Sequence, residues 1–384
     1  MNEGLLFSEN FDKASCRRYL KDKQFVYESE TDTLDSAELR RMIKFVNIVE
    51  KASVFTKLPI IFKFETLKLN DKISYILFEY ICYYLIKFRK CKCCVMINFE
   101  DSILSYYAKS SPLFLLTYQK VIGAQANFEK ISEDYIKAFE NQLESQHIRK
   151  IIKKEELGTD ANSKFSTNVS LTLGFLDMEE AQVDSICEVI SELVDNAGEH
   201  ADADCLVDID ITPEHIKRDS EDSYYGVNIV VLNFSKELLG NHIEDVLKSD
   251  TSPNEWYMKL KEARSFHKNF WNDIYTERDF YIMSAFQNKI STRSEDYYTG
   301  GTGLTKLIAA LEYQSDAYKC FVWTGNRTLA FWHPLLQLDD SDWVGFNNEK
   351  NFVQSPPNTD IFQKSKIYFP GTAYNLSFVL KKEN

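Results

Sequence analysis

A polar row within residues 186–200 contains the residue types best suited to chemistry in this chain. The segment has the sequence ICEVISELVDNAGEH, in which Glu192, Asn196 and His200 follow one another at intervals of four residues. In a helix this spacing places a carboxylate, a carboxamide and an imidazole on one face. A carboxylate can serve as a general base, and a hard cation such as Mg²⁺ takes oxygen ligands. The row therefore favours a site for acid–base or metal-assisted chemistry.

An ordinary amphipathic helix is the alternative explanation of the same segment. Its apolar residues recur at helical spacing: Ile186, Val189, Ile190, Leu193, Val194 and Ala197. Two residues argue against a purely structural helix. Asn196 is a poor helix former at a position inside the helix, and Gly198 weakens the helix end, where the backbone could approach a ligand.

A glycine-rich turn at residues 298–304, YTGGTGL, precedes the apolar helical pattern TKLIAALEY. Gly301 and Gly303 have no Cβ, so their backbone amides can approach phosphate oxygens closely. The N-terminus of the following helix adds a dipole that favours anions. A plain turn into a helix explains one glycine more readily than Gly300, Gly301 and Gly303 together.

Alternating apolar residues predict strands on either side of this turn. The segment 227–232, VNIVVL, is expected to form a strand that leads into Asn233 and Ser235. Residues 370–380, PGTAYNLSFVL, alternate as a half-buried strand does. Residues 318–331 are expected to form a hairpin that turns at Gly325 and Asn326.

These motifs together resemble the Bergerat-fold (GHKL) ATPases, the superfamily of gyrase B, MutL-type repair proteins, sensor histidine kinases and anti-sigma-factor serine kinases. SELVDNAGEH is similar to the N-box of that superfamily. The resemblance implies that Glu192 polarises the attacking water or hydroxyl, that Asn196 ligates magnesium and that His200 meets the phosphates.

The glycine boxes of the superfamily have counterparts here too. The turn at 300–304 resembles the second glycine box, which implies phosphate contacts from a set of consecutive residues: Gly300, Gly301, Thr302, Gly303 and Leu304. The first glycine box, DxGxG, is replaced by a run in which Asn233 takes the Asp position and Ser235 the first Gly position. The resemblance implies that Asn233 faces the adenine amino group, from which an Asn carbonyl can accept a hydrogen bond.

The N-terminal part shows a strand–helix–strand pattern. Residues 58–64 and 93–99 are expected to be strands, and residues 70–88 a long helix that begins at the capping residues Asn70 and Asp71. This order predicts a parallel βαβ unit in a small α/β domain. One interpretation is a STAS-like domain, a type that accompanies some GHKL modules.

The expected organisation is an α/β protein with two domains. Residues 1–125 form the smaller N-terminal α/β domain, and residues 126–164 a connecting helix and loop, since 127–156 is highly charged and helical in pattern. Residues 165–384 form an α/β sandwich of the Bergerat type, with an insertion near 333–367.

Composition excludes some classes of function. The 384 residues carry a net charge of -13, which disfavours binding to nucleic acid. The most apolar stretch, 73–86, is too short and interrupted to span a bilayer and is expected to be a buried helix. The chain begins without a basic region followed by an apolar run, so a cytoplasmic location is expected.

The cysteines are expected to be free thiols of a reducing compartment. Cys91, Cys93 and Cys94 form a CxCC cluster, but no further Cys or His follows at the spacing that a zinc site needs. Because Cys93 and Cys94 open the apolar run CCVMINF, a buried strand is the favoured interpretation.

The resemblance implies a regulatory protein that binds Mg-ATP and hydrolyses it to switch a partner interaction, in bacterial signalling or defence. An ATPase is favoured over a serine/threonine protein kinase of the anti-sigma type, and a degenerate binding module without catalysis is a third hypothesis. A histidine kinase is disfavoured, since His147 is followed by Ile148 rather than by an acidic residue. A protein partner is expected but unidentified, and a homodimer is one possible arrangement.

Overall fold

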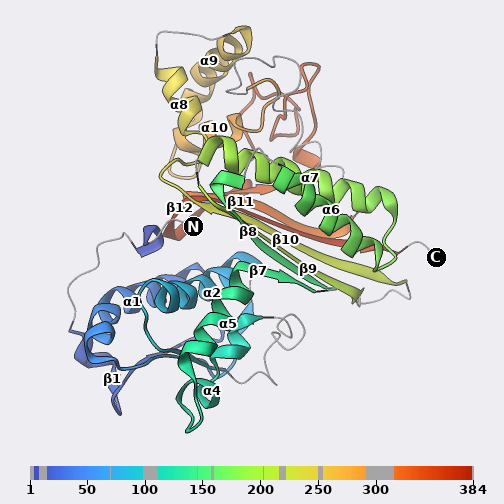
Figure 1. Ribbon diagram of the computed structural model, residues 1–384. Helices are drawn as coiled ribbons and strands as arrows, with labels where there is room; N and C mark the ends of the chain where they lie inside the picture. Colours follow the sequence, from blue (N-terminus) through green and yellow to red (C-terminus); the bar gives the residue numbers. More distant parts are fainter. Residues whose placement is uncertain are drawn as a thin grey trace. The chain divides into compact units, whose positions relative to one another are not determined.

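The computed structural model describes residues 4–7, 15–69, 71–97, 111–144, 146–156, 160–201, 203–215, 222–249, 254–290 and 315–382. Helices alternate with strands that form parallel and antiparallel pairs, so the expected α/β class is confirmed (Figure 1). The chain divides into two compact units. The first contains Met1–Ile151, Asp208–Asp210 and Lys366–Tyr368, and the second contains Ile152–Val207, Ile211–Ser365 and Phe369–Asn384.

The first unit contains a four-stranded sheet with the order β1-β2-β4-β6. These strands are β1 (Leu20–Lys21), β2 (Gln24–Glu28), β4 (Ile60–Lys63) and β6 (Cys93–Met96). β4 pairs in parallel with both β2 and β6, and α2 (Lys72–Lys87) connects β4 to β6. The predicted parallel βαβ unit is therefore confirmed.

Local signals explain the two long helices of this unit. Asp71 caps α2 by accepting a hydrogen bond from the Ser74 amide, and Asp35 caps α1 (Ser36–Thr56) in the same way. Every residue from Ile73 to Ile86 is buried, as expected for a helix that is apolar on all sides. Further elements of the unit are β3 (Thr33–Leu34), β5 (Lys68–Leu69), α4 (Tyr118–Ile122) and α5 (Phe128–Glu140).

The expected helix over 127–156 is only half correct. α5 ends at Glu140, and the chain continues as β7 (Asn141–Leu143) and β8 (His147–Ile152), which pair antiparallel. The charges of this segment suggested an exposed helix, but His147 and Arg149 are buried in β8. Carboxylates from distant parts of the chain neutralise them, and sequence spacing does not show those partners.

The larger sheet has six strands in the order β11-β12-β10-β9-β8-β7. Its long strands are β9 (Cys205–His215), β10 (Tyr224–Phe234), β11 (Ser315–Phe331) and β12 (Phe362–Lys381). β12 pairs antiparallel with both β10 and β11. Two helices, α6 (Asp160–Gly174) and α7 (Glu180–Ala201), pack against each other on one face of the long strands, and α7 contacts β10 (Figure 1).

The hairpin expected at Gly325 and Asn326 does not exist. β11 continues through both residues and stays paired with β12, with register shifts on either side of Gly325. Gly325 has a φ of 57°, so it provides a bulge in the strand and not a reversal of the chain.

Three helices between β10 and β11 form a folded layer with the segment after β11. They are α8 (Asn241–Lys248), α9 (Glu255–His267) and α10 (Glu277–Ser284). The buried Trp343 donates to the Asn288 carbonyl at 3.0 Å, and His267 contacts the Phe352 carbonyl at 2.6 Å. The inserted segment therefore packs on these helices through specific contacts before β12 begins at Phe362.

Candidate functional site

The predicted catalytic helix is present as α7. Its apolar residues are buried, whereas Glu192 and Asn196 are half-buried on its polar side. Asn196 Nδ2 donates to Glu192 Oε1 at 3.3 Å, so the four-residue spacing does bring the two side chains together. His200 lies in the last turn of α7, but its side chain lies outside the described residues.

Tyr374 shows where the Glu192 carboxylate lies relative to the sheet. Burial raises the pKa of the Tyr374 hydroxyl above its ordinary value, and the negative charge of Glu192 raises this pKa further. Glu192 therefore lies close enough for its charge to act on the Tyr374 hydroxyl. The face follows from Tyr225 of β10, whose hydroxyl donates at 2.8 Å to the Leu176 carbonyl in the loop that joins α6 to α7. Val231, six residues along β10, shares that face and pairs with Tyr374, so Tyr374 also lies on the face that these helices cover.

Asn233 lies on this same face of the sheet. It is the residue of β10 directly opposite Thr372 of β12, and paired residues of neighbouring strands share a face. Thr372 and Tyr374 are two positions apart on β12, so they also share a face, at a separation of about 7 Å. Along the strands, the pair of Asn233 and Thr372 therefore lies two residues from the pair that contains Tyr374, whose hydroxyl pKa responds to the charge of Glu192.

A close approach of two backbones fixes the position of Asn233. Gly371 has a φ of 130°, and a Cβ at this position would lie 2.1 Å from the Asn233 carbonyl oxygen. Only glycine fits such an approach. The Asn233 side chain is 5% exposed, and its Oδ1 accepts a hydrogen bond from the Thr372 amide at 3.3 Å.

Ser235 forms part of an ordered turn after β10. Its amide donates to the Pro370 carbonyl at 3.1 Å, and its hydroxyl oxygen accepts from the Glu237 amide at 3.0 Å. Thr324 of β11, which lies opposite Thr372, accepts from the Leu239 amide at 3.2 Å. The run that replaces the first glycine box is therefore held to the middle of β11 and β12.

The structure thus brings together part of the predicted site. Glu192, Asn196 and Asn233 lie on or over one face of the sheet, with Thr372 and Tyr374 between them. Sequence reasoning missed Thr372 and Tyr374 as site residues because alternation predicts a strand but not the face that each residue occupies. The predicted phosphate contacts lie outside the described residues: Gly300, Gly301, Thr302, Gly303 and Leu304.

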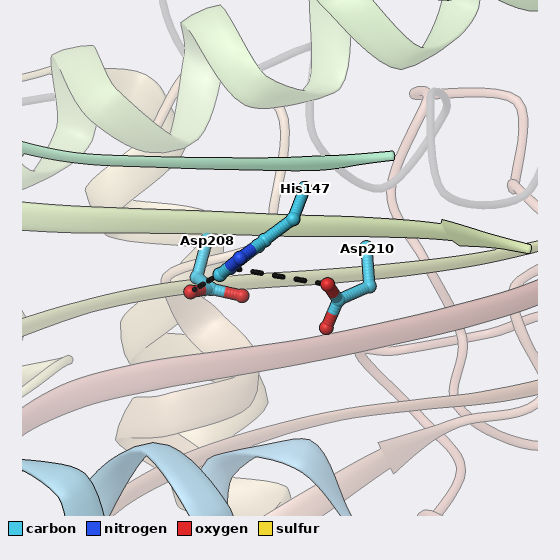
Figure 2. Close-up of side chains that lie close together, drawn as sticks. All are labelled: His147, Asp208 and Asp210. Carbon is cyan, nitrogen blue, oxygen red and sulfur yellow. Dashed lines mark hydrogen bonds and ion pairs between the residues drawn. The ribbon is translucent and has the colours of Figure 1, made fainter. Parts of the chain in front are cut away.

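A second polar cluster lies in the first unit. His147, Asp208 and Asp210 have ligand atoms within 4.8 Å of one another, an arrangement that could hold a metal ion (Figure 2). His147 Nε2 lies 3.0 Å from Asp208 Oδ2 and 3.9 Å from Asp210 Oδ1. Asp208 and Asp210 are two residues apart on β9, so both point to the same face.

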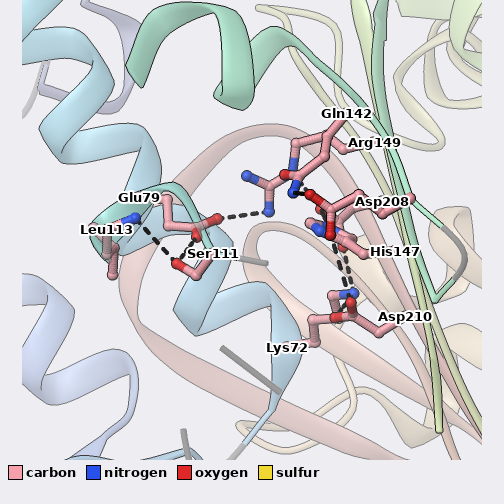
Figure 3. A network of polar contacts seen from close by, with 10 residues as sticks. Lys72, Glu79, Ser111, Leu113, Gln142, His147, Arg149, Asp208 and Asp210 are labelled. Atoms are coloured by element: carbon pink, nitrogen blue, oxygen red, sulfur yellow. Dashed lines mark hydrogen bonds and ion pairs between the residues drawn. The ribbon is translucent and has the colours of Figure 1, made fainter. Parts of the chain in front are cut away.

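Two basic side chains already neutralise this cluster. Lys72 forms ion pairs with both Asp208 and Asp210, and Arg149 bridges Asp208 to Glu79, with 2.6 Å between Arg149 Nη2 and Glu79 Oε2 (Figure 3). Burial alone would raise the pKa of Asp208, but the charges of Arg149, Lys72 and His147 hold it well below the ordinary range.

Since the Lys72 ammonium contacts both carboxylates that would bind a metal, we interpret the cluster as a structural ion network. Ser111 extends it by donating to Glu79 Oε1 at 2.7 Å. No sequence motif predicts the network. Its one signal is the alternation DIDI at 208–211, which places two acidic residues on one face of an otherwise apolar strand.

The CxCC cluster contributes no metal site among the residues that the structure describes. Cys91, Cys93 and Cys94 are buried free thiols in and before β6.

Within the described ranges, no helix is both long enough and apolar enough to cross a membrane. Comparisons of the chain with protein-family models, curated proteins and solved structures found no match.

Proposed function

We propose that the second unit is a Bergerat-type domain that binds a magnesium-complexed purine nucleoside triphosphate, ATP in the resemblance, and hydrolyses it. One observation carries the proposal. Glu192 and Asn233 come from two separate motifs of the resemblance, and the face of β10 that contains Asn233 is the face that α6 and α7 cover. A chance match of two short motifs gives no reason for such convergence.

The side chains suit the roles that the resemblance implies. The Asn196 amide donates through Nδ2 to Glu192, which leaves Oδ1 as the end that faces away from the carboxylate. An amide oxygen is a ligand that Mg²⁺ accepts, and the bound ion would neutralise charge on the phosphates. The same hydrogen bond holds Glu192 in one orientation, as a general base requires.

The sheet supplies the other side of the site. Asn233, near the end of β10, and Thr372, within β12, offer an amide and a hydroxyl that a nucleotide base would meet. Glu192 would act as the general base for hydrolysis, and hydrolysis would drive the partner switch. A partner protein that accepts the phosphoryl group in place of water would instead make the protein a kinase.

Calorimetric titration with Mg-ATP tests the binding site. We expect binding by the wild-type protein that weakens by at least about tenfold in Asn196→Ala and when magnesium is chelated, since each removes the bridge to the phosphates. Glu188→Ala is the matched control, because Glu188 is an exposed carboxylate on the same helix. An affinity for ATP that changes neither when magnesium is chelated nor in Asn196→Ala would contradict the proposed site.

Release of inorganic phosphate tests the chemistry. We expect Glu192→Ala to lower the rate of hydrolysis by about 10²–10⁴-fold, the contribution of a general base, while Mg-ATP still binds. Glu188→Ala again serves as the control. Unchanged hydrolysis in Glu192→Ala would refute its role as the base, and binding without any hydrolysis in the wild type would favour the non-catalytic module.

A further inference from the structure

The side-chain amide of Asn233 has one orientation only. The Thr372 amide is a hydrogen-bond donor, so the atom that faces it must be the acceptor Oδ1 and not the donor Nδ2. A flip of the Asn233 amide would place two donors against each other. Gly371 packs on the same group, since a Cβ there would lie 3.0 Å from Oδ1.

This orientation leaves Nδ2, and not Oδ1, as the end of the Asn233 side chain that a ligand could meet. Among the described residues, no side chain or backbone carbonyl accepts a hydrogen bond from Asn233 Nδ2, although the residue is 5% exposed. Asn233 thus offers a ligand the N–H groups of Nδ2, whereas an Asp at this position would offer a second acceptor oxygen.

The neighbouring Thr372 does not counteract this preference. Its hydroxyl donates to the Thr324 hydroxyl at an Oγ1–Oγ1 distance of 3.5 Å, since the Thr324 hydroxyl itself donates to the Gly371 carbonyl. A contact this long is weak, so the Thr372 hydroxyl can rotate to donate or accept as a ligand requires. Asn233 is therefore the group that discriminates between bases.

We propose that the nucleotide site of the second unit selects a 6-oxopurine base, of the guanine or hypoxanthine type, over adenine. The inference rests on the proposed function. A carbonyl at purine position 6 accepts from Asn233 Nδ2, whereas the amino group of adenine is itself a donor and would face another donor. Sites built around one hydrogen bond discriminate strongly against the analogue that leaves a buried polar group unpaired.

Inosine triphosphate and ATP are the matched probes for this test. The two bases differ at position 6 and in the proton that N1 carries as a result, and neither has a substituent at position 2. We expect calorimetry to show that Mg-ITP binds the wild-type protein at least about tenfold more tightly than Mg-ATP, which corresponds to about 1.4 kcal/mol.

Asn233→Asp should reverse the preference. A carboxylate can accept from the Thr372 amide with one oxygen and presents a second acceptor to the base, so the adenine amino group becomes the better partner. Asn228→Asp, on the same strand but far from its end, is the control that adds the same charge without touching the base. Thermal unfolding of each variant reports whether it is folded.

The outcomes separate this inference from the proposed function. Tighter binding of Mg-ITP, with reversal in Asn233→Asp, supports the inference. Binding of Mg-ATP by the wild type that equals or exceeds that of Mg-ITP overturns the base preference and leaves the nucleotide site standing. Absence of binding by either nucleotide overturns both proposals. The comparison of Mg-ITP with Mg-ATP on the wild-type protein tests the base preference even if Asn233→Asp fails to fold.

Discussion

Lys72 joins two carboxylates in the ion network of the first unit. Its side chain is 10% exposed and pairs with Asp208 and Asp210, the former wholly buried. We expect Lys72→Met to lower the free energy of unfolding by about 1–3 kcal/mol, because Asp210 loses its lysine partner while Arg149 and His147 still pair with Asp208. Equilibrium denaturation in urea or guanidinium measures this loss.

A surface ion pair provides the contrast at the same scale. Lys68 pairs with Asp32, and both side chains are about half exposed. Because water screens such pairs, we expect Lys68→Met to leave the unfolding transition unchanged. A Lys72→Met protein as stable as the wild type would show that Asp208 and Asp210 find other partners, and a divalent cation that stabilised this variant selectively would identify the replacement.

At the scale of elements, the parts that sequence predicted are those whose signals are local. α2 follows from Asp71 and an apolar run, and α7 follows from apolar residues at helical spacing. The parallel pairing of β4 and β6 follows from the helix between them. Each of these signals lies within the element or immediately beside it.

The elements that sequence missed depend on distant partners. β8 buries Arg149 because Asp208, far along the chain, neutralises it. β11 continues through Gly325 because β12 pairs with it on both sides of the bulge. The candidate site divides in the same way: the row of Glu192 and Asn196 is local, whereas the place of Tyr374 depends on the sheet register.

The helical layer of α9 and α10 should respond to pH through His267. This side chain is fully buried, with Nδ1 2.5 Å from the Tyr275 hydroxyl and Nε2 2.6 Å from the Phe352 carbonyl. In the neutral ring, Nε2–H donates to the carbonyl and Nδ1 accepts from the hydroxyl. Burial lowers the pKa of His267, and the hydrogen bond to Phe352 opposes this only in part.

A lowered pKa means that folding favours neutral His267. Its contribution to stability is complete above the unfolded pKa of about 6.5 and is lost as the pH falls through the lower folded pKa. We therefore expect the protection factors of the amides in 254–290, which relate each exchange rate to its intrinsic rate at the same pH, to fall below about pH 6.5, and His267→Gln to lose this dependence. His242→Gln, at an exposed position on α8, is the control. An equal fall of the protection factors in His267→Gln would assign the effect to other groups.

At the scale of the whole molecule, the first compact unit is not a continuous piece of chain. Residues 208–210 belong to it, although β9 otherwise belongs to the second unit. Asp208 supplies a carboxylate that the fully buried Arg149 needs. A fragment that ends at residue 151 retains Glu79 but loses Asp208, and an incompletely paired buried guanidinium is strongly destabilising.

We therefore expect a fragment of residues 1–151 not to fold alone. Its circular dichroism should lack a cooperative thermal transition, although it contains the whole four-stranded sheet β1-β2-β4-β6. The matched control is the same fragment with both Glu79→Gln and Arg149→Leu, which removes the two buried charges together and should recover part of the transition if the unpaired Arg149 is the cause. If the unsubstituted fragment unfolds as cooperatively as the full chain, the ion network is dispensable, and the first unit is an independent domain to which residues 208–210 add little.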